Sequence, residues 1–176
     1  GLAELGHRIS IVTNFSASES KLRGFVTAAR GRVGVFSCSL HLEYVSDIAA
    51  FVDKARWFRE ALLVARDLRL PAPSLNVTTV ATQSALPRLA ELATVFADKG
   101  VVFKVQPEKL DGGLVTYTPQ QESQLVQLGG HNRTGQIAHR FTGQPCWSGR
   151  SYFIVDDRGI AYRCYPARRH KMERLG

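Results

Sequence analysis

The segment "VGVFSCSLH" (33–41) alternates between apolar and polar side chains along its second half. A period of two is typical of a β-strand that packs one face against a core and presents the other face to a different environment. The apolar positions are Phe36, Cys38 and Leu40, and the polar positions are Ser37, Ser39 and His41. The pattern predicts a strand that has one face under helices and a polar second face.

Three other segments have β-strand character, namely "RISIVTN" (8–14), "LNVTTVAT" (75–82) and "VVFKVQ" (101–106). Apolar residues at helical spacing follow the first three strands, near 18–30, 46–68 and 84–99, and a further helix is expected to begin at Thr118-Pro119. Strict alternation of strand and helix predicts right-handed βαβ units and a parallel sheet. The predicted fold class is therefore α/β.

The second face of the predicted sheet is polar in every strand. A parallel strand that is covered on both faces normally has an almost continuous apolar sequence. Here the second face carries Ser10, Asn14, Ser37, Ser39, His41, Asn76, Thr78, Lys104 and Gln106. A polar interior favours an open or incomplete barrel that leaves room for a polar ligand. Its polar groups gather toward the carboxyl ends of the strands, where α/β folds bind ligands.

Composition narrows the classes of protein that remain. The 176 residues are 44% apolar and 22% charged, and the formal net charge is +8. No apolar run reaches about 18 residues and no signal segment begins the chain, so we expect a cytoplasmic protein that contacts no membrane. Three cysteines are too few for a secreted disulfide scaffold. The first residue is not Met, and we expect the chain to be a piece of a longer protein.

Positive charge gathers in the last part of the chain. From Arg140 to Gly176 there are eight Arg or Lys residues against three acidic residues. Such a surface suits nucleic acid, an acidic peptide or an anionic cofactor, and a solvated basic surface is the simpler interpretation.

Two of the cysteines flank a predicted hairpin in "PCWSGRSYFIVDDRGIAYRC" (145–164). The strands are expected at 151–155 and 160–163, with a turn at 156–159, which brings Cys146 and Cys164 to one end. Thiolates held in this way suit a soft metal or an iron–sulfur cluster. Zinc is a competing metal, although no CxxC or His pair completes a tetrahedral set here. Two unrelated buried cysteines, or one disulfide, are the structural alternative.

The spacing C-x12-G-x4-C in this hairpin resembles the opening of the SPASM and twitch domains, which follow the barrel of many radical S-adenosylmethionine (radical SAM) enzymes. "ISIVTN" and "VFSCSLHLEYV" are similar to the third and fourth barrel strands of that family, and "LNVTTVAT" and "VVFKVQPEK" would be the fifth and sixth. The resemblance implies a partial (βα)6 TIM-like barrel over 1–117, a linker with a helix over 118–143, and the start of a SPASM or twitch domain over 144–176. The signature CxxxCxxC is absent, and the resemblance places it upstream of Gly1.

The resemblance also implies an activity and a set of contacts. The parent enzyme would cleave S-adenosylmethionine reductively at a [4Fe-4S] cluster outside this fragment, and the 5′-deoxyadenosyl radical would abstract hydrogen from a substrate such as a peptide or protein. Asn14 and Ser39 would contact S-adenosylmethionine, and the substrate would lie near Thr13, His41, Lys104 and Gln106. Cys146 and Cys164 would ligate an auxiliary [4Fe-4S] cluster, and a flavodoxin or ferredoxin would supply electrons. No catalytic residue is assigned, and the fragment alone is expected to be inactive.

Two other functions fit the residues. One is a TIM-like barrel enzyme that binds a phosphorylated metabolite, with Lys104 and Ser39 as anion contacts. The other is a basic nucleic-acid-binding module with structural cysteines, although no interleaved exposed aromatics or known motif support it. His41 and Glu43 alone do not complete a metal site.

Overall fold

The computed structural model divides the chain into two compact units, Gly1–His139 (unit 1) and Arg140–Gly176 (unit 2), which are described separately. The residues described are 3–110, 113–129, 145–146, 148–150, 153–156 and 158–175. Predicted features at 130–144 of the linker, at 151–152 of the hairpin and at Asp157 of the turn lie outside these residues.

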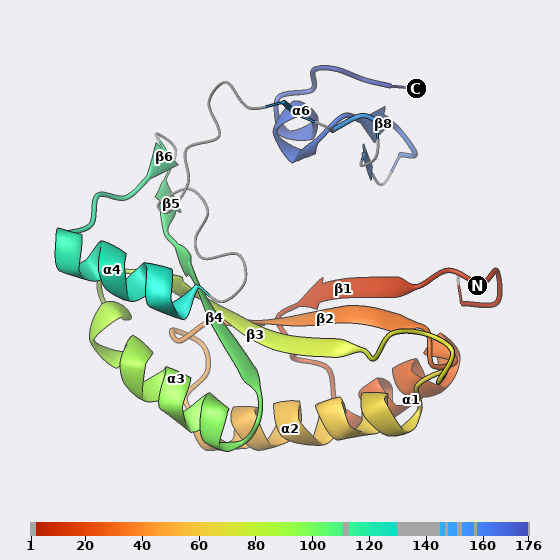
Figure 1. The fold of residues 1–176 in the computed structure, drawn as a ribbon, viewed down its shortest axis with the longest axis horizontal. Helices are drawn as coiled ribbons and strands as arrows, with labels where there is room; N and C mark the ends of the chain where they lie inside the picture. The colour runs from red at the N-terminus through yellow and green to blue at the C-terminus, as the bar shows by residue number, and fades with distance from the viewer. Residues whose placement is uncertain are drawn as a thin grey trace. The chain divides into compact units, whose positions relative to one another are not determined.

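Unit 1 is built on a four-stranded parallel sheet (Figure 1). Its strands are β1 (Ile9–Thr13), β2 (Val33–Leu40), β3 (Ser74–Ala81) and β4 (Val102–Pro107), and they lie side by side in chain order. The predicted α/β class, strand order and parallel direction are confirmed, and each predicted strand lies within one or two residues of the observed one.

Helices α1 and α2 begin where the sequence supplies capping side chains. The side chains of Ser18 and Asp47 accept hydrogen bonds from Lys21 N and Ala50 N, which satisfies main-chain donors in the first turn. The helices are α1 (Glu19–Ala29), α2 (Ile48–Val64) and α3 (Leu89–Asp98), the last preceded by a 3₁₀ turn, η1 (Leu86–Arg88). Because neighbouring strands are also consecutive, right-handed connections place these helices on one face of the sheet (Figure 1).

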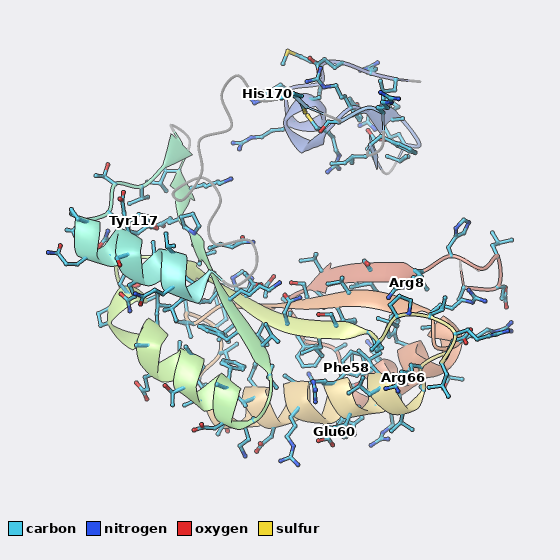
Figure 2. All side chains as sticks on the ribbon, viewed as in Figure 1. Arg8, Phe58, Glu60, Arg66, Tyr117 and His170 are labelled. Carbon is cyan, nitrogen blue, oxygen red and sulfur yellow. The ribbon has the colours of Figure 1, made fainter. Side chains whose placement is uncertain are left out.

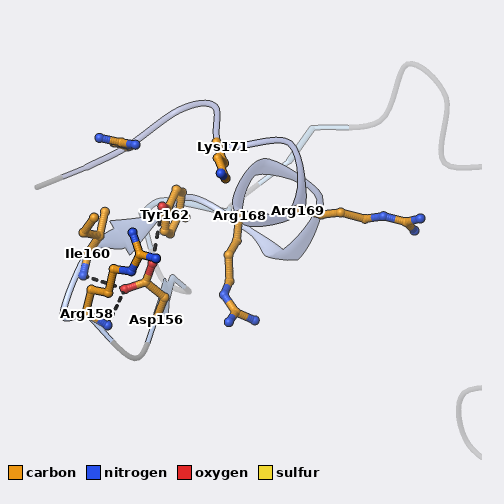
Figure 3. Close-up of a pocket in the computed structure, with 8 residues that line it drawn as sticks. Asp156, Arg158, Ile160, Tyr162, Arg168, Arg169 and Lys171 are labelled. Atoms are coloured by element: carbon orange, nitrogen blue, oxygen red, sulfur yellow. Dashed lines mark hydrogen bonds between the residues drawn. The ribbon is translucent and has the colours of Figure 1, made fainter.

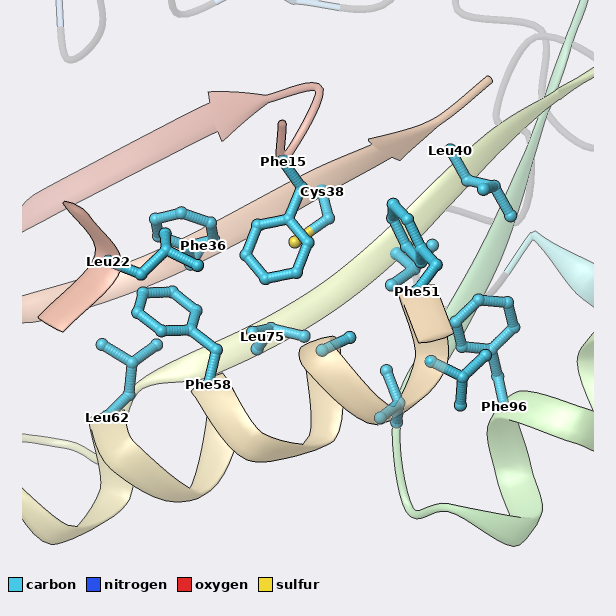
Figure 4. Packing of buried hydrophobic residues seen from close by; sticks show 14 of the residues in the cluster. Phe15, Leu22, Phe36, Cys38, Leu40, Phe51, Phe58, Leu62, Leu75 and Phe96 are labelled. Atoms are coloured by element: carbon cyan, nitrogen blue, oxygen red, sulfur yellow. The ribbon is translucent and has the colours of Figure 1, made fainter. Parts of the chain in front are cut away.

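The main core lies between this face and the helices and is rich in phenylalanine (Figure 4). Phe58 is fully buried, and its ring centroid lies 4.7 Å from that of Phe36 and 5.7 Å from that of Phe15. Figure 2 shows Phe58 directed from α2 toward the sheet, whereas Glu60 points away from it. Cys38 is 0% exposed within this cluster, which confirms that its strand face turns toward the helices.

A second core joins α4 (Pro119–Leu128) to the end of the sheet. Thr118 and Gln121 form a reciprocal capping box, so the helix begins where Thr118-Pro119 predicts. Leu125 is fully buried, and the Tyr117 hydroxyl donates to Ala81 O at 2.8 Å while it accepts from Glu108 N at 2.7 Å. This helix therefore packs as part of unit 1. A short antiparallel pair, β5 (Lys109–Leu110) and β6 (Gly113–Leu114), precedes it.

Unit 2 contains the predicted hairpin, with an antiparallel ladder between β7 (Ile154–Val155) and β8 (Ala161–Tyr162). Gly159 adopts φ +81°, a left-handed conformation that a side chain would strain, and its N–H donates to Asp156 O at 3.1 Å. A short helix, α6 (Tyr165–Arg169), follows. The chain then returns beside β8, where Leu175 N donates to Ala161 O at 2.9 Å.

Candidate functional site on the polar face of the sheet

The candidate site lies on the sheet face opposite the helices, called here the polar face and defined by Ser37, Ser39, Asn76, Thr78 and Lys104. In the described part of unit 1, α1, α2 and α3 pack on the other face and form the main core with it. Helix α4 lies on that face as well, because its Leu125 clusters with Ala81 and Val105. The polar face also carries exposed valines, Val12 (78%), Val35 (42%), Val80 (39%) and Val102 (51%), so the prediction that the second face is polar throughout is only partly correct. Parallel sheets are normally covered on both faces, so this mixture suits a face that meets a ligand or further protein.

Strand register arranges the polar side chains in rows across the sheet. Ser39 pairs with Thr78, and Thr78 pairs with Lys104, so these three side chains lie on one face at one level. The preceding row on this face contains Ser37 and Asn76, and the Ser37 hydroxyl donates to Asn76 Oδ1 at 2.9 Å. Thr78 Oγ1 lies 3.3 Å from the same oxygen, which links the two rows.

Lys104 is the cationic member of this arrangement. The residue is only 7% exposed, and this burial lowers the pKa of its ammonium group. An ammonium group in the same row as the hydroxyl groups of Ser39 and Thr78 has the chemistry to bind an anionic oxygen.

Two more of the predicted site residues lie one row nearer the carboxyl ends. Val80 pairs with Gln106, and His41 directly follows Leu40, the partner of Thr79, so His41 reaches the level of Val80. His41 is half exposed, and its Nδ1 lies 3.9 Å from Glu43 Oε1. Among the described residues, no three His, Cys, Asp or Glu side chains come together in a way that would hold a metal ion.

The loop after β1 places Asn14 and Thr13 differently. Asn14 follows Thr13, the partner of Cys38, and so lies at the level of Ser39. Its Oδ1 accepts from Ser16 N at 3.2 Å and from Ser16 Oγ at 2.8 Å, which fixes the amide in the turn. Thr13 pairs with Cys38 and therefore takes the helix-facing side, so the structure does not bring it into the polar rows.

A lysine from α2 fixes the same loop. Lys54 Nζ donates to Phe15 O at 2.8 Å and to Ala17 O at 2.7 Å, and it lies 4.6 Å from the centroid of the Phe15 ring. Phe15 has φ +59°, an unfavourable conformation for a residue with a side chain. These contacts hold the turn that presents Asn14 at the end of β1.

Asn76 and Thr78 also belong to the site. The sequence predicts that they lie on this face but gives them no binding role. Asn76 is 3% exposed and accepts hydrogen bonds from residues of two strands, so it organises the rows. The signal for both is their position on the same alternating face as Ser39 and Lys104. Their exact neighbours depend on strand register, which the alternation alone does not specify.

The two hairpin cysteines in unit 2 carry no disulfide. Cys146 is exposed and Cys164 is partly buried. Hydrogen bonds from Ser148 and, to a smaller extent, the positive Arg163 lower the pKa of the Cys146 thiol. The main chain also approaches Arg163 closely at Gly149, where an added Cβ would lie 2.8 Å from Arg163 Cγ. Cys146 therefore lies close to Arg163, the residue that precedes Cys164.

Comparison of the chain with protein-family models, with curated proteins and with solved structures finds no match. None of the helices in the described part of the chain is long and apolar enough to cross a membrane. The fold and the site define the class: an α/β protein with a parallel sheet in sequential order and a polar face opposite its helices.

Proposed function

We propose that this chain is part of a radical SAM enzyme, in which β1 to β4 are strands three to six of a (βα)6 TIM-like barrel and unit 2 begins a SPASM or twitch domain. The observation that carries the proposal is the topology of unit 1. A doubly wound sheet reverses its strand order and acquires helices on both faces. A sheet in sequential order, with right-handed connections, keeps its helices on one face, as in a barrel wall.

The chemistry of the polar face supports a barrel that holds a polar ligand. The interior of a closed eight-stranded barrel is filled by Val, Ile and Leu. Here the corresponding face carries, beside its four valines, a row of Ser39, Thr78 and Lys104, with Asn14 at the same level. Hydroxyl, amide and ammonium groups match the ribose and carboxylate of S-adenosylmethionine. Ser39 and Asn14 are therefore assigned to the cofactor, and Lys104 is placed to meet an anionic oxygen.

The substrate would lie beyond the cofactor at the carboxyl ends, beside His41 and Gln106. When bound, S-adenosylmethionine and a reduced [4Fe-4S] cluster supply a radical for hydrogen abstraction. The residues of this chain bind and orient the reactants and keep water away. The proposal requires the CxxxCxxC motif to lie outside these 176 residues, and it takes a peptide or protein as substrate and a flavodoxin or ferredoxin as reductant.

Cys146 and Cys164 are assigned to an auxiliary [4Fe-4S] cluster. The lowered pKa of Cys146 favours the thiolate, which is the form that binds iron. Cys38 is excluded as a third ligand, because it is fully buried in unit 1 and burial raises the pKa of its thiol to about 12. The remaining cluster ligands would come from residues outside the described part of unit 2.

Binding of S-adenosylmethionine tests the cofactor assignment. In the full-length protein, reconstituted anaerobically, we expect Ser39→Ala to weaken equilibrium binding by about 2- to 10-fold, the value of one hydrogen bond. Ser74→Ala is the matched control, since Ser74 lies on the same face at the amino end of β3 and is exposed. Equal effects of the two substitutions would contradict the assignment. Binding of inorganic phosphate that is lost in Lys104→Met, without S-adenosylmethionine binding, would favour the phosphorylated-metabolite enzyme.

A further inference from the structure

Unit 2 contains a pocket that the proposed function does not use. Its volume is about 350 Å³, within the range of sites for small molecules. The walls come from the hairpin turn, from β8, and from α6 with the segment that follows it (Figure 3). The lining residues are Asp156, Arg158, Ile160, Tyr162, Arg168, Arg169, Lys171 and Arg174.

The lining is strongly cationic. Figure 3 shows the guanidinium of Arg169 pointing away from the other labelled side chains, so it is left out of the count. The remaining cations are Arg158, Arg168, Lys171 and Arg174, against the single carboxylate of Asp156. Within the described residues, no acidic side chain forms an ion pair with Arg158, Lys171 or Arg174.

The carboxylate in the pocket is already committed to the hairpin turn. Asp156 Oδ1 accepts from Arg158 N at 2.9 Å and from Ile160 N at 3.0 Å, and the Tyr162 hydroxyl donates to Oδ2 at 3.4 Å. Burial alone would raise the pKa of Asp156, but the main-chain N–H groups, this hydroxyl and the charge of Arg168 outweigh it and lower the pKa. Asp156 is thus a structural anion, and the pocket keeps an excess of positive charge.

Main-chain hydrogen bonds hold the walls of the pocket together. Met172 N donates to Ala167 O at 2.8 Å, which ties the segment after α6 back to that helix. Arg163 N donates to Glu173 O at 3.3 Å, and Tyr162 bridges Arg174, which ties the same segment to β8. The cations are therefore presented from a connected framework, which lowers the entropic cost of binding.

We propose that this pocket binds a diphosphate group, either free or as part of a nucleotide. Arginine guanidinium groups match phosphate oxygens in pairs, and several cations around one hollow favour a compact ligand with several charges. Single-stranded nucleic acid would need exposed aromatic platforms for base stacking. Tyr162 is the aromatic residue of the lining, and it is only 4% exposed. The shape and composition therefore favour a small phosphate ligand over a nucleic-acid strand.

Titration calorimetry of the full chain with sodium pyrophosphate tests this proposal. We expect one site per chain, and at least about 10-fold weaker binding in Arg158→Gln and in Arg174→Gln, because each loses a charge-assisted hydrogen bond. Arg66→Gln is the control, since Arg66 is exposed in unit 1 and its substitution changes net charge equally. We expect it to change affinity by less than about 2-fold. Arg158 and Arg174 lie on different segments, so loss of folding in one variant leaves the other as a test.

Comparison of ligands identifies the recognised group. Equal affinity for pyrophosphate and ADP would show that the pocket recognises the diphosphate alone. Tighter binding of ADP than of pyrophosphate, with no binding of adenosine, would show that the ligand is a nucleotide. Both results support the proposal. The proposal is overturned if pyrophosphate does not bind, if citrate binds as tightly, or if Arg66→Gln weakens binding as much as the pocket variants. Binding of a single-stranded oligonucleotide that pyrophosphate cannot displace would likewise overturn it, and would assign a nucleic-acid surface.

Discussion

Replacement of Lys54 by methionine should destabilise the protein by freeing the loop that carries Asn14. The ammonium group donates to two main-chain carbonyls, Phe15 O at 2.8 Å and Ala17 O at 2.7 Å, and it lies over the Phe15 ring. Methionine keeps much of the aliphatic length of the side chain but removes the charge and the donors. The substitution therefore isolates the polar contacts from the packing of α2.

The size of the effect follows from these contacts. A hydrogen bond to a charged group contributes about 1.5–3 kcal/mol, and a cation–π contact contributes about 0.5–1 kcal/mol when it is exposed. The carbonyls are only partly buried, and water replaces some of the lost bonding. We therefore expect Lys54→Met to lower the free energy of unfolding by about 2–3 kcal/mol. With a urea m-value of about 1–3 kcal/mol/M, the midpoint should fall by about 0.7–3 M.

Lys99→Met is the matched control. Lys99 Nζ lies 3.1 Å from Asp53 Oδ1, but both side chains are largely exposed, so this ion pair should contribute less than about 1 kcal/mol. Urea unfolding of both variants, followed by far-UV circular dichroism, measures the difference. If Lys54→Met costs no more than Lys99→Met, the lysine does not hold the loop, and the reasoning about Asn14 is refuted.

Three other perturbations test separate parts of the structure. Gly31→Ala should lower the free energy of unfolding by more than about 2 kcal/mol, because its Cβ would collide with main-chain atoms after α2. In Gly100→Ala the added Cβ meets no atom, so the loss should be only about 1–2 kcal/mol for the positive φ. Urea unfolding measures both losses. Iodoacetamide labelling with mass spectrometry should modify Cys146 readily near neutral pH and leave Cys38 intact below pH 9, and early labelling of Cys38 would contradict its burial. In the reconstituted full-length protein, alanine at Cys146 or Cys164 should lower iron per chain and the absorbance near about 400 nm, with no loss for Cys38→Ala; unchanged iron in both hairpin variants would remove the cluster assignment.

The sequence predicted the elements of unit 1 well because their signals are local. Alternation in 33–41 comes from burial on one face, and the start of α4 comes from the N-cap Thr118 and the proline in its first turn. The face on which Thr13 lies could also be predicted, because Thr13 is two and four residues from Ile11 and Ile9, which face the helices. The prediction that Thr13 lies among the polar substrate residues was inconsistent with this alternation.

Features that depend on distant segments could not be predicted. The row of Ser39, Thr78 and Lys104 exists because β2, β3 and β4 pair in one register, and alternation is compatible with several registers. The basic pocket of unit 2 depends on the return of Arg174 beside Tyr162, which no local pattern encodes. The sequence shows the excess of positive charge in 140–176, but it does not show that several of these side chains line one pocket.

Formation of 5′-deoxyadenosine tests the central proposal most directly. The full-length protein should be reconstituted anaerobically with iron and sulfide, reduced with dithionite and given S-adenosylmethionine, and the products should be quantified by liquid chromatography and mass spectrometry. The proposal predicts 5′-deoxyadenosine in amounts that require both the reductant and the iron–sulfur cluster, and less of it in Ser39→Ala than in Ser74→Ala. The absence of 5′-deoxyadenosine from a protein that has taken up its iron would contradict the radical SAM assignment.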